Sequence, residues 1–162
     1  HGAEICRDLQ DRLVMIARVS DAGAFVNTNA LTLKRSHGDY SVMQLLYDGS
    51  EIKAVLDFVN AGEVPIAWEL IRSYSYMDCT FNAARLAAYT NEYRRYAEVS
   101  MDDLRYMPYL YLGQLLSSTY GYKQYLQTGD EELLAFGRWR TEMCRYLIAN
   151  AGEVSAELVR LA

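Results

Sequence analysis

The sequence predicts a mainly α-helical protein that carries one small β-hairpin. Three observations favour this fold class: apolar residues recur at helical spacing in several segments, two apolar runs flank an Asp-Gly pair, and the second half contains a single proline. The chain has 162 residues, of which 51% are hydrophobic and 23% charged. That length and composition suit one buried core, so we expect a single domain over residues 1–162.

The first predicted helix runs from about residue 3 to residue 19. Apolar side chains at intervals of three and four residues define one face of this helix, and we expect that face to be buried. The face comprises Ile5, Leu9, Leu13 and Ile16. Residues 20–29 contain Asp, Gly and two Asn and indicate a loop, and residues 31–33 form a short candidate strand.

The predicted hairpin joins the apolar runs 43–47 and 51–58 through the turn Asp48-Gly49-Ser50. Asp39 comes just before the first strand and Asp57 ends the second, where the preceding apolar residues indicate partial burial. Because an antiparallel hairpin returns to its starting edge, we expect both carboxylates and the amide of Gln44 to lie close together. Such oxygen atoms can bind Mg²⁺ and supply one general base.

Helices are predicted to fill the rest of the chain. Pro65 suits the first turn of a helix, and the apolar residues after it are continuous enough to indicate burial on several sides. Ser100 and Asp103 form an acidic variant of the capping pattern that opens a helix, and Thr128-Gly129 ends that same helix. The predicted ranges are 65–77, 81–97, 101–126 with a bend near Pro108, 130–149, and a short 154–161.

Charge and composition exclude several classes of function. A net charge of −5 and a pI near 5.0 argue against a general nucleic-acid surface. No apolar run approaches the ~18 residues of a membrane span, and charged residues interrupt every early apolar stretch, so we expect neither a membrane segment nor a signal peptide. Three dispersed cysteines, Cys6, Cys79 and Cys144, indicate buried free thiols in a cytoplasmic protein.

The segment HGDYSVMQLLYDGSEIKAVLDFVNAG, which begins at His37, resembles the catalytic core of the aminoglycoside phosphotransferase family. That family is similar to choline kinase and, more distantly, to protein kinases. Its pattern is His-Gly-Asp, an amide residue five positions later, a hairpin, and an Asp that opens a short turn. The resemblance implies the C-terminal helical lobe of a protein-kinase-like fold.

The resemblance also implies a role for each site residue. Asp39 corresponds to the residue that orients the acceptor hydroxyl and takes its proton. Gln44 and Asp57 correspond to the ligands of the Mg²⁺ ions that bridge the phosphates of ATP. His37 would brace the loop, and Glu69 in Val64-Pro65-Ile66-Ala67-Trp68-Glu69-Leu70 would bind the loop backbone from below.

The sequence departs from the family pattern at three positions and in one region. Gln44 replaces the usual Asn, Val59 stands where Gly is usual, and Glu69 stands where Asp is common. No Gly-rich phosphate loop or strand lysine precedes His37. We therefore expect this chain to be the C-terminal lobe of a longer protein, which needs its own N-terminal lobe for efficient transfer.

The expected function is ATP-dependent phosphoryl transfer to a small-molecule hydroxyl on an aminoglycoside-, amino alcohol- or sugar-like acceptor. The alternative is a degenerate kinase-like module that binds without transfer; a helical protein with a coincidental motif is a third hypothesis. The many Tyr side chains of the later helices suit core packing, or else a pocket for a cationic acceptor together with acids such as Glu92 or Glu142.

Overall fold

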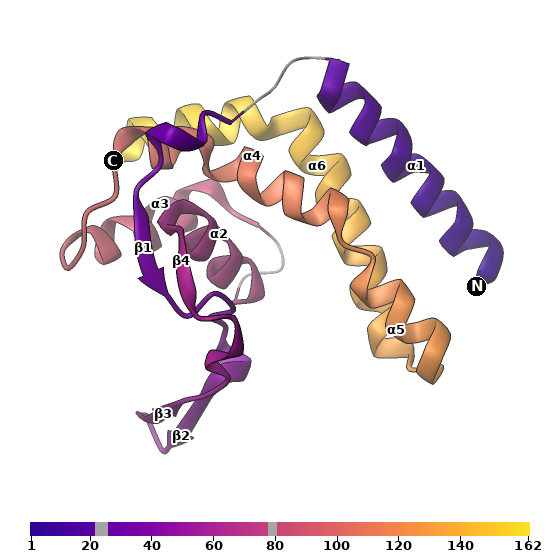
Figure 1. Cartoon of the computed structure of the whole chain (residues 1–162), viewed down its shortest axis with the longest axis horizontal. Coiled ribbons are helices and arrows are strands. Elements are labelled where there is room, and N and C mark those ends of the chain that lie inside the picture. The colour runs from indigo at the N-terminus through magenta and orange to yellow at the C-terminus, as the bar shows by residue number, and fades with distance from the viewer. Residues whose placement is uncertain (22–25, 78–80) are drawn as a thin grey trace. The chain divides into compact units, whose positions relative to one another are not determined.

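The computed structural model describes residues 1–21, 26–77 and 81–162 (Figure 1). Its contacts divide the chain into two compact units, which we describe separately. The first unit comprises His1–Val26 and Tyr109–Ala151, and the second comprises Asn27–Pro108 and Gly152–Ala162. The assignment of residues 1–162 to one domain stays a prediction.

The elements confirm a mainly α-helical fold with a small hairpin. The helices are α1 (Gly2–Asp21), α2 (Ile66–Met77), α3 (Ala83–Arg94), α4 (Met101–Ser117), α5 (Tyr120–Thr128) and α6 (Glu131–Leu161). The strands are β1 (Leu33–Ser36), β2 (Leu45–Asp48), β3 (Glu51–Val55) and β4 (Gly62–Pro65).

The strands form two separate antiparallel pairs in the second unit (Figure 1). The predicted hairpin is β2–β3, in which Leu45 lies opposite Val55. Its turn contains Gly49, whose φ of +59° suits a residue without a Cβ. The second pair, β1–β4, was not predicted, because β4 coincides with a Gly-Glu-Val-Pro segment that offers no alternating pattern.

Local signals in the sequence predicted several helix ends correctly. The Ser100 hydroxyl accepts a hydrogen bond from the Asp103 N–H at 3.0 Å, and the Asp103 carboxylate accepts one from the Ser100 N–H at 2.8 Å. This reciprocal cap begins α4. Gly129, with a φ of +72°, ends α5 in the left-handed conformation that glycine adopts readily.

Three predicted helical ranges are divided or joined in the structure. The range 101–126 is divided into α4 and α5. The side-chain hydroxyls of Ser117-Ser118-Thr119 compete with the helix for backbone hydrogen bonds, which favours a break there. The ranges 130–149 and 154–161 are instead one helix, α6, since Gly152 costs only about 1 kcal/mol within a helix.

The buried face of α1 differs from the predicted one. Ile5 and Met15 are buried, but Leu13 is 66% exposed and Ile16 is also exposed. Arg12 is buried in their place, because its guanidinium finds partners inside the first unit. It donates to the Leu115 carbonyl at 3.3 Å, the Ser118 carbonyl at 2.6 Å, the Gly137 carbonyl at 3.2 Å, and the Thr141 hydroxyl at 2.7 and 2.9 Å.

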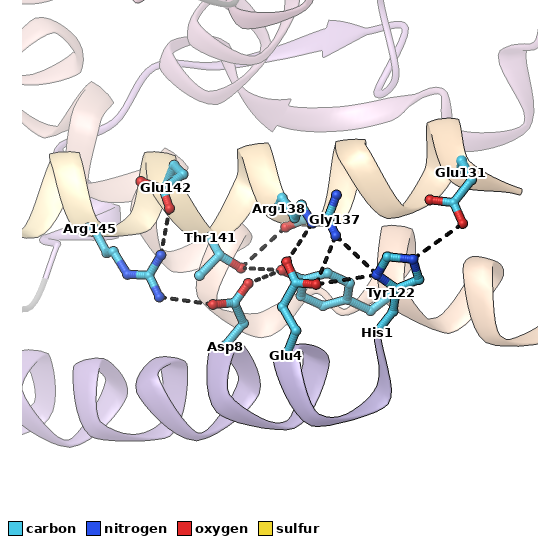
Figure 2. A network of polar contacts seen from close by, with 10 residues as sticks. All are labelled: His1, Glu4, Asp8, Tyr122, Glu131, Gly137, Arg138, Thr141, Glu142 and Arg145. Atoms are coloured by element: carbon cyan, nitrogen blue, oxygen red, sulfur yellow. Dashed lines mark hydrogen bonds and ion pairs between the residues drawn. The ribbon is translucent and has the colours of Figure 1, made fainter.

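Ionic contacts also join α1 to α6 within the first unit (Figure 2). Arg138 donates to both oxygens of Glu4 at 2.6 and 2.8 Å. Arg145 pairs with Asp8 at 2.9 Å, and Asp8 also accepts a hydrogen bond from the Tyr122 hydroxyl. Glu4 and Asp8 therefore have arginine or phenol partners that hold α1 in place.

The prediction of buried thiols is only partly correct. Cys144 is buried, but Cys6 is exposed on α1, and Cys79 lies outside the described residues. Burial raises the pKa of the Cys144 thiol. Within the described residues, no helix combines the length and apolar content that crossing a membrane requires.

Candidate active site

The loop His37-Gly38-Asp39 follows β1 and has a backbone that requires glycine at its centre. Gly38 has a φ of +76°, which side-chain-bearing residues rarely adopt. A Cβ at this position would overlap the carbonyl oxygen of Asn60. The small residue thus permits a close approach between the loop and the segment that follows β3.

Glu69 fixes this loop from the first turn of α2. Its two carboxylate oxygens accept hydrogen bonds from the N–H groups of Gly38 at 3.1 Å and Tyr40 at 3.0 Å. The side chain is only 8% exposed, so these bonds satisfy a buried charge. Glu69 thus binds the backbone of the loop, and its role in a reaction stays a prediction.

His37 links the loop to the end of the hairpin. Its Nε2 lies 2.6 Å from the carbonyl oxygen of Leu56, and its Nδ1 lies 3.3 Å from the N–H of Asp39. These partners define a tautomer in which Nε2 donates and Nδ1 accepts. The ring also lies 4.7 Å from that of Phe58, centroid to centroid. His37 therefore bridges the peptide of Asp39 and the carbonyl that precedes Asp57.

Gln44 and Asp57 come to the same end of the hairpin. The Leu56 N–H donates to the main-chain carbonyl of Gln44 at 2.8 Å. This bond places the backbone of Gln44 beside the residue that precedes Asp57. Asp57 has φ 60° and ψ 64°, a left-handed conformation, and its side chain caps no N–H of the following 3-10 helix, Phe58–Asn60. The predicted partial burial of Asp57 is wrong: the chain reverses there, and the residue is exposed.

The oxygen atoms of Gln44 and Asp57 suit a hard cation such as Mg²⁺. Within the described residues, no group of three or more His, Cys, Asp or Glu side chains could hold a metal alone. Protein sites for Mg²⁺ commonly use one or two carboxylates and complete the coordination with water and substrate phosphates. The exposed carboxylate of Asp57 and the amide of Gln44 are both oxygen donors of this kind.

The departure at Val59 is compatible with the local backbone. Among the described residues other than glycine, only Asp57 and Phe81 have positive φ. Val59 therefore needs no glycine-like conformation, and its side chain is 88% exposed. The valine neither strains the turn nor occupies the space of a neighbouring group.

One site residue was missed in the sequence. Arg72, on α2, forms an ion pair with Asp39 and is only 9% exposed. Its guanidinium carbon lies 5.3 Å from the centroid of the Trp68 ring. The available signal was a charged residue within a helix predicted to be buried on several sides, because such a charge requires a partner.

Two cavities adjoin the loop, and Arg35, Ser36 and His37 line both. One has a volume of about 330 Å³ and is also lined by Tyr40, Glu69, Tyr89 and Tyr93. Burial raises the pKa of all three phenols, and the Glu69 charge contributes at Tyr89 and Tyr93. The other, of about 590 Å³, extends along Phe58, Ala61, Gly62 and Glu63.

The acids considered for a cationic pocket, Glu92 and Glu142, are not among the residues that line the cavity of about 330 Å³. Glu92 pairs with Arg95 on α3, and Glu142 pairs with Arg145 on α6. The buried acid that faces tyrosines at the loop is Glu69.

The braced glycine–aspartate loop, the hairpin and the second aspartate at the hairpin's end all lie within one stretch of the second unit, residues 37–69. The model of the phosphotransferase enzyme family matches residues 7–99, more than half of the chain, and the chain belongs to that family. Membership indicates phosphotransferase activity in general. Comparisons with individual curated proteins and with solved structures gave no match.

Proposed function

We propose that this protein transfers the γ-phosphoryl group of ATP to a hydroxyl of a small molecule, with Asp39 as the acceptor-orienting base. The observation that carries the proposal is the way Glu69 and His37 hold the backbone around Asp39. Glu69 binds the N–H groups on both sides of it, and His37 connects its own N–H to the end of β3. Such rigidity suits a reaction catalysed mainly by positioning.

Asp39 accepts a hydrogen bond from the acceptor hydroxyl and receives its proton as the oxygen attacks the phosphorus. The bond from phosphorus to the bridging oxygen of ADP breaks in line with this attack. The side chain of Asp39 is 27% exposed, so the carboxylate is reachable from solvent.

Gln44 and Asp57 are the proposed ligands of Mg²⁺, which when bound neutralises charge on the nucleotide phosphates. The Gln44→Asn variant tests the first ligand. Since asparagine presents the same amide oxygen on a side chain one methylene shorter, Mg²⁺ affinity should be kept or improved. Complete loss of affinity would contradict the assignment.

The acceptor is proposed to be small, of the amino alcohol, sugar or aminoglycoside type. The cavity of about 330 Å³ supports this, because it adjoins the loop that carries Asp39 and its three phenols suit hydroxyl and ammonium groups. Its volume lies at the lower end of the range for ligand pockets and favours a small acceptor.

The nucleotide base is proposed to contact the protein's own N-terminal lobe, in the cytoplasm, where ATP is available. Exposed apolar side chains around the hairpin support the proposal that the N-terminal lobe covers the hairpin. They include Met43 at 80% exposure, Leu46 at 50%, Ile52 at 52% and Val59 at 88%.

The experiment measures phosphate transfer from Mg·ATP by the protein with that lobe, across a panel of hydroxylated amines and sugars. Asp39→Asn should abolish acceptor-dependent turnover and leave nucleotide affinity nearly intact. The matched control is Asp48→Asn, which alters an exposed aspartate in the hairpin turn and should retain turnover. Absence of both turnover and nucleotide binding in the wild type would favour the degenerate binding module instead.

A further inference from the structure

Helix α2 carries two buried charged side chains almost one turn apart, and both contact the loop. Glu69 binds backbone N–H groups, whereas Arg72 reaches the side chain of Asp39. Residues three apart lie on neighbouring parts of a helix surface, so one rigid element can hold both the backbone and the side chain of the loop.

We propose that Arg72 is a positioning residue for phosphoryl transfer: it holds the Asp39 carboxylate in the orientation that accepts the acceptor hydroxyl. This inference rests on the proposed function, since it assigns a further residue to the same reaction. It concerns the side-chain torsions of Asp39, which the contacts of Glu69 leave undetermined.

One carboxylate oxygen of Asp39, Oδ1, forms an ion pair with Nη2 of Arg72, and the Asp39 side chain is 27% exposed. The ion pair restricts rotation of the carboxylate, and the exposure leaves the group accessible to an acceptor hydroxyl. Charge-assisted hydrogen bonds of this type are stronger and more directional than neutral ones.

Arg72 is itself held in place. It is 9% exposed, and the ring of Trp68, one turn earlier on the same helix, lies 5.3 Å from its guanidinium carbon. Stacking on an aromatic ring and a planar set of donors distinguish arginine from lysine, whose ammonium is a mobile point charge. The geometry therefore requires arginine rather than any cation.

The test compares Arg72→Met, Arg72→Lys and Arg72→Ala in the full-length protein, with Mg·ATP and the acceptor from the panel. Misplacement of the base should lower kcat about 100-fold in Arg72→Met, without a change in the KM for Mg·ATP. Arg72→Lys should recover only part of this loss. Millimolar guanidinium should partly restore turnover in Arg72→Ala, because the free ion can occupy the vacated space.

The control is Arg12→Met, which removes a buried arginine of the first unit. It should lower thermal stability and leave turnover per folded molecule unchanged. Two results would overturn this inference and leave the proposed function intact. One is a turnover of Arg72→Met equal to that of the wild type. The other is a loss of turnover that follows the unfolded fraction and is not rescued by guanidinium. An inactive wild type would overturn the proposed function and this inference with it.

Discussion

The two units place charged side chains in different settings. In the first unit, the carboxylates of Glu4 and Asp8 pair with Arg138 and Arg145, so that the charges satisfy one another and hold α1. In the second unit, Asp57 is exposed in a left-handed conformation and caps no helix. The difference separates acids that stabilise the fold from acids that are available to a ligand.

The two buried arginines extend the comparison. Arg12 donates to backbone carbonyls and a hydroxyl near the end of α4, a structural role. Arg72 pairs with the aspartate of the candidate active site. Burial alone therefore does not indicate the role of an arginine; the chemical identity of its partner does.

The largest expected effect is at Asp57. Asp57→Gly should lower turnover about 1,000-fold and remove Mg²⁺-dependent nucleotide binding, because a ligand of the metal is lost. The free energy of unfolding should not fall, since glycine relieves the left-handed strain and this offsets its larger backbone entropy in the unfolded state. Steady-state kinetics measure the turnover, and denaturant melts measure the free energy of unfolding. A clear loss of stability would show that Asp57 has a structural role.

Arg12→Met should produce the largest loss of stability in the first unit. Removal of the guanidinium leaves buried carbonyls without a donor, and we expect the free energy of unfolding to fall by about 3 kcal/mol. Chemical denaturation monitored by circular dichroism measures this change. A variant as stable as the wild type would indicate that water replaces the guanidinium without cost.

Glu69 connects stability and function, so its variants should change both. Glu69→Ala leaves two loop N–H groups unpaired and should lower the free energy of unfolding by about 2 kcal/mol. Glu69→Gln should cost less, because the amide oxygen can still accept one bond. Thermal melts and turnover assays of both variants test whether alanine costs more than glutamine. A change within experimental noise would show that water replaces the carboxylate without cost.

The smallest effect concerns Tyr122 at alkaline pH. Burial, together with the hydrogen bond to Asp8, raises the pKa of the Tyr122 hydroxyl from 10 to about 12. A raised pKa in the folded state contributes stability that is complete below pH 10 and is lost as the pH rises through 12. The stability difference between the wild type and Tyr122→Phe should therefore shrink over this interval in pH-dependent melts. A constant difference would contradict the prediction.

The sequence by itself determined the features that depend on near neighbours. The Asp-Gly turn of the hairpin, the Ser100–Asp103 cap and the stop at Gly129 each result from local backbone chemistry. The motif from His37 to Asp57 also identified the family, because its residue types and spacing are local properties of the chain.

Only the tertiary structure decided which charged groups are buried and what they contact. Arg12 displaces Leu13 from the buried face of α1 because its partners come from residues 115–141, more than a hundred positions away. Arg72 reaches Asp39 from another element, and Asp57 is exposed where its apolar neighbours predicted burial. Long-range hydrogen bonds and ion pairs outweigh local hydrophobic patterns when they satisfy a buried charge.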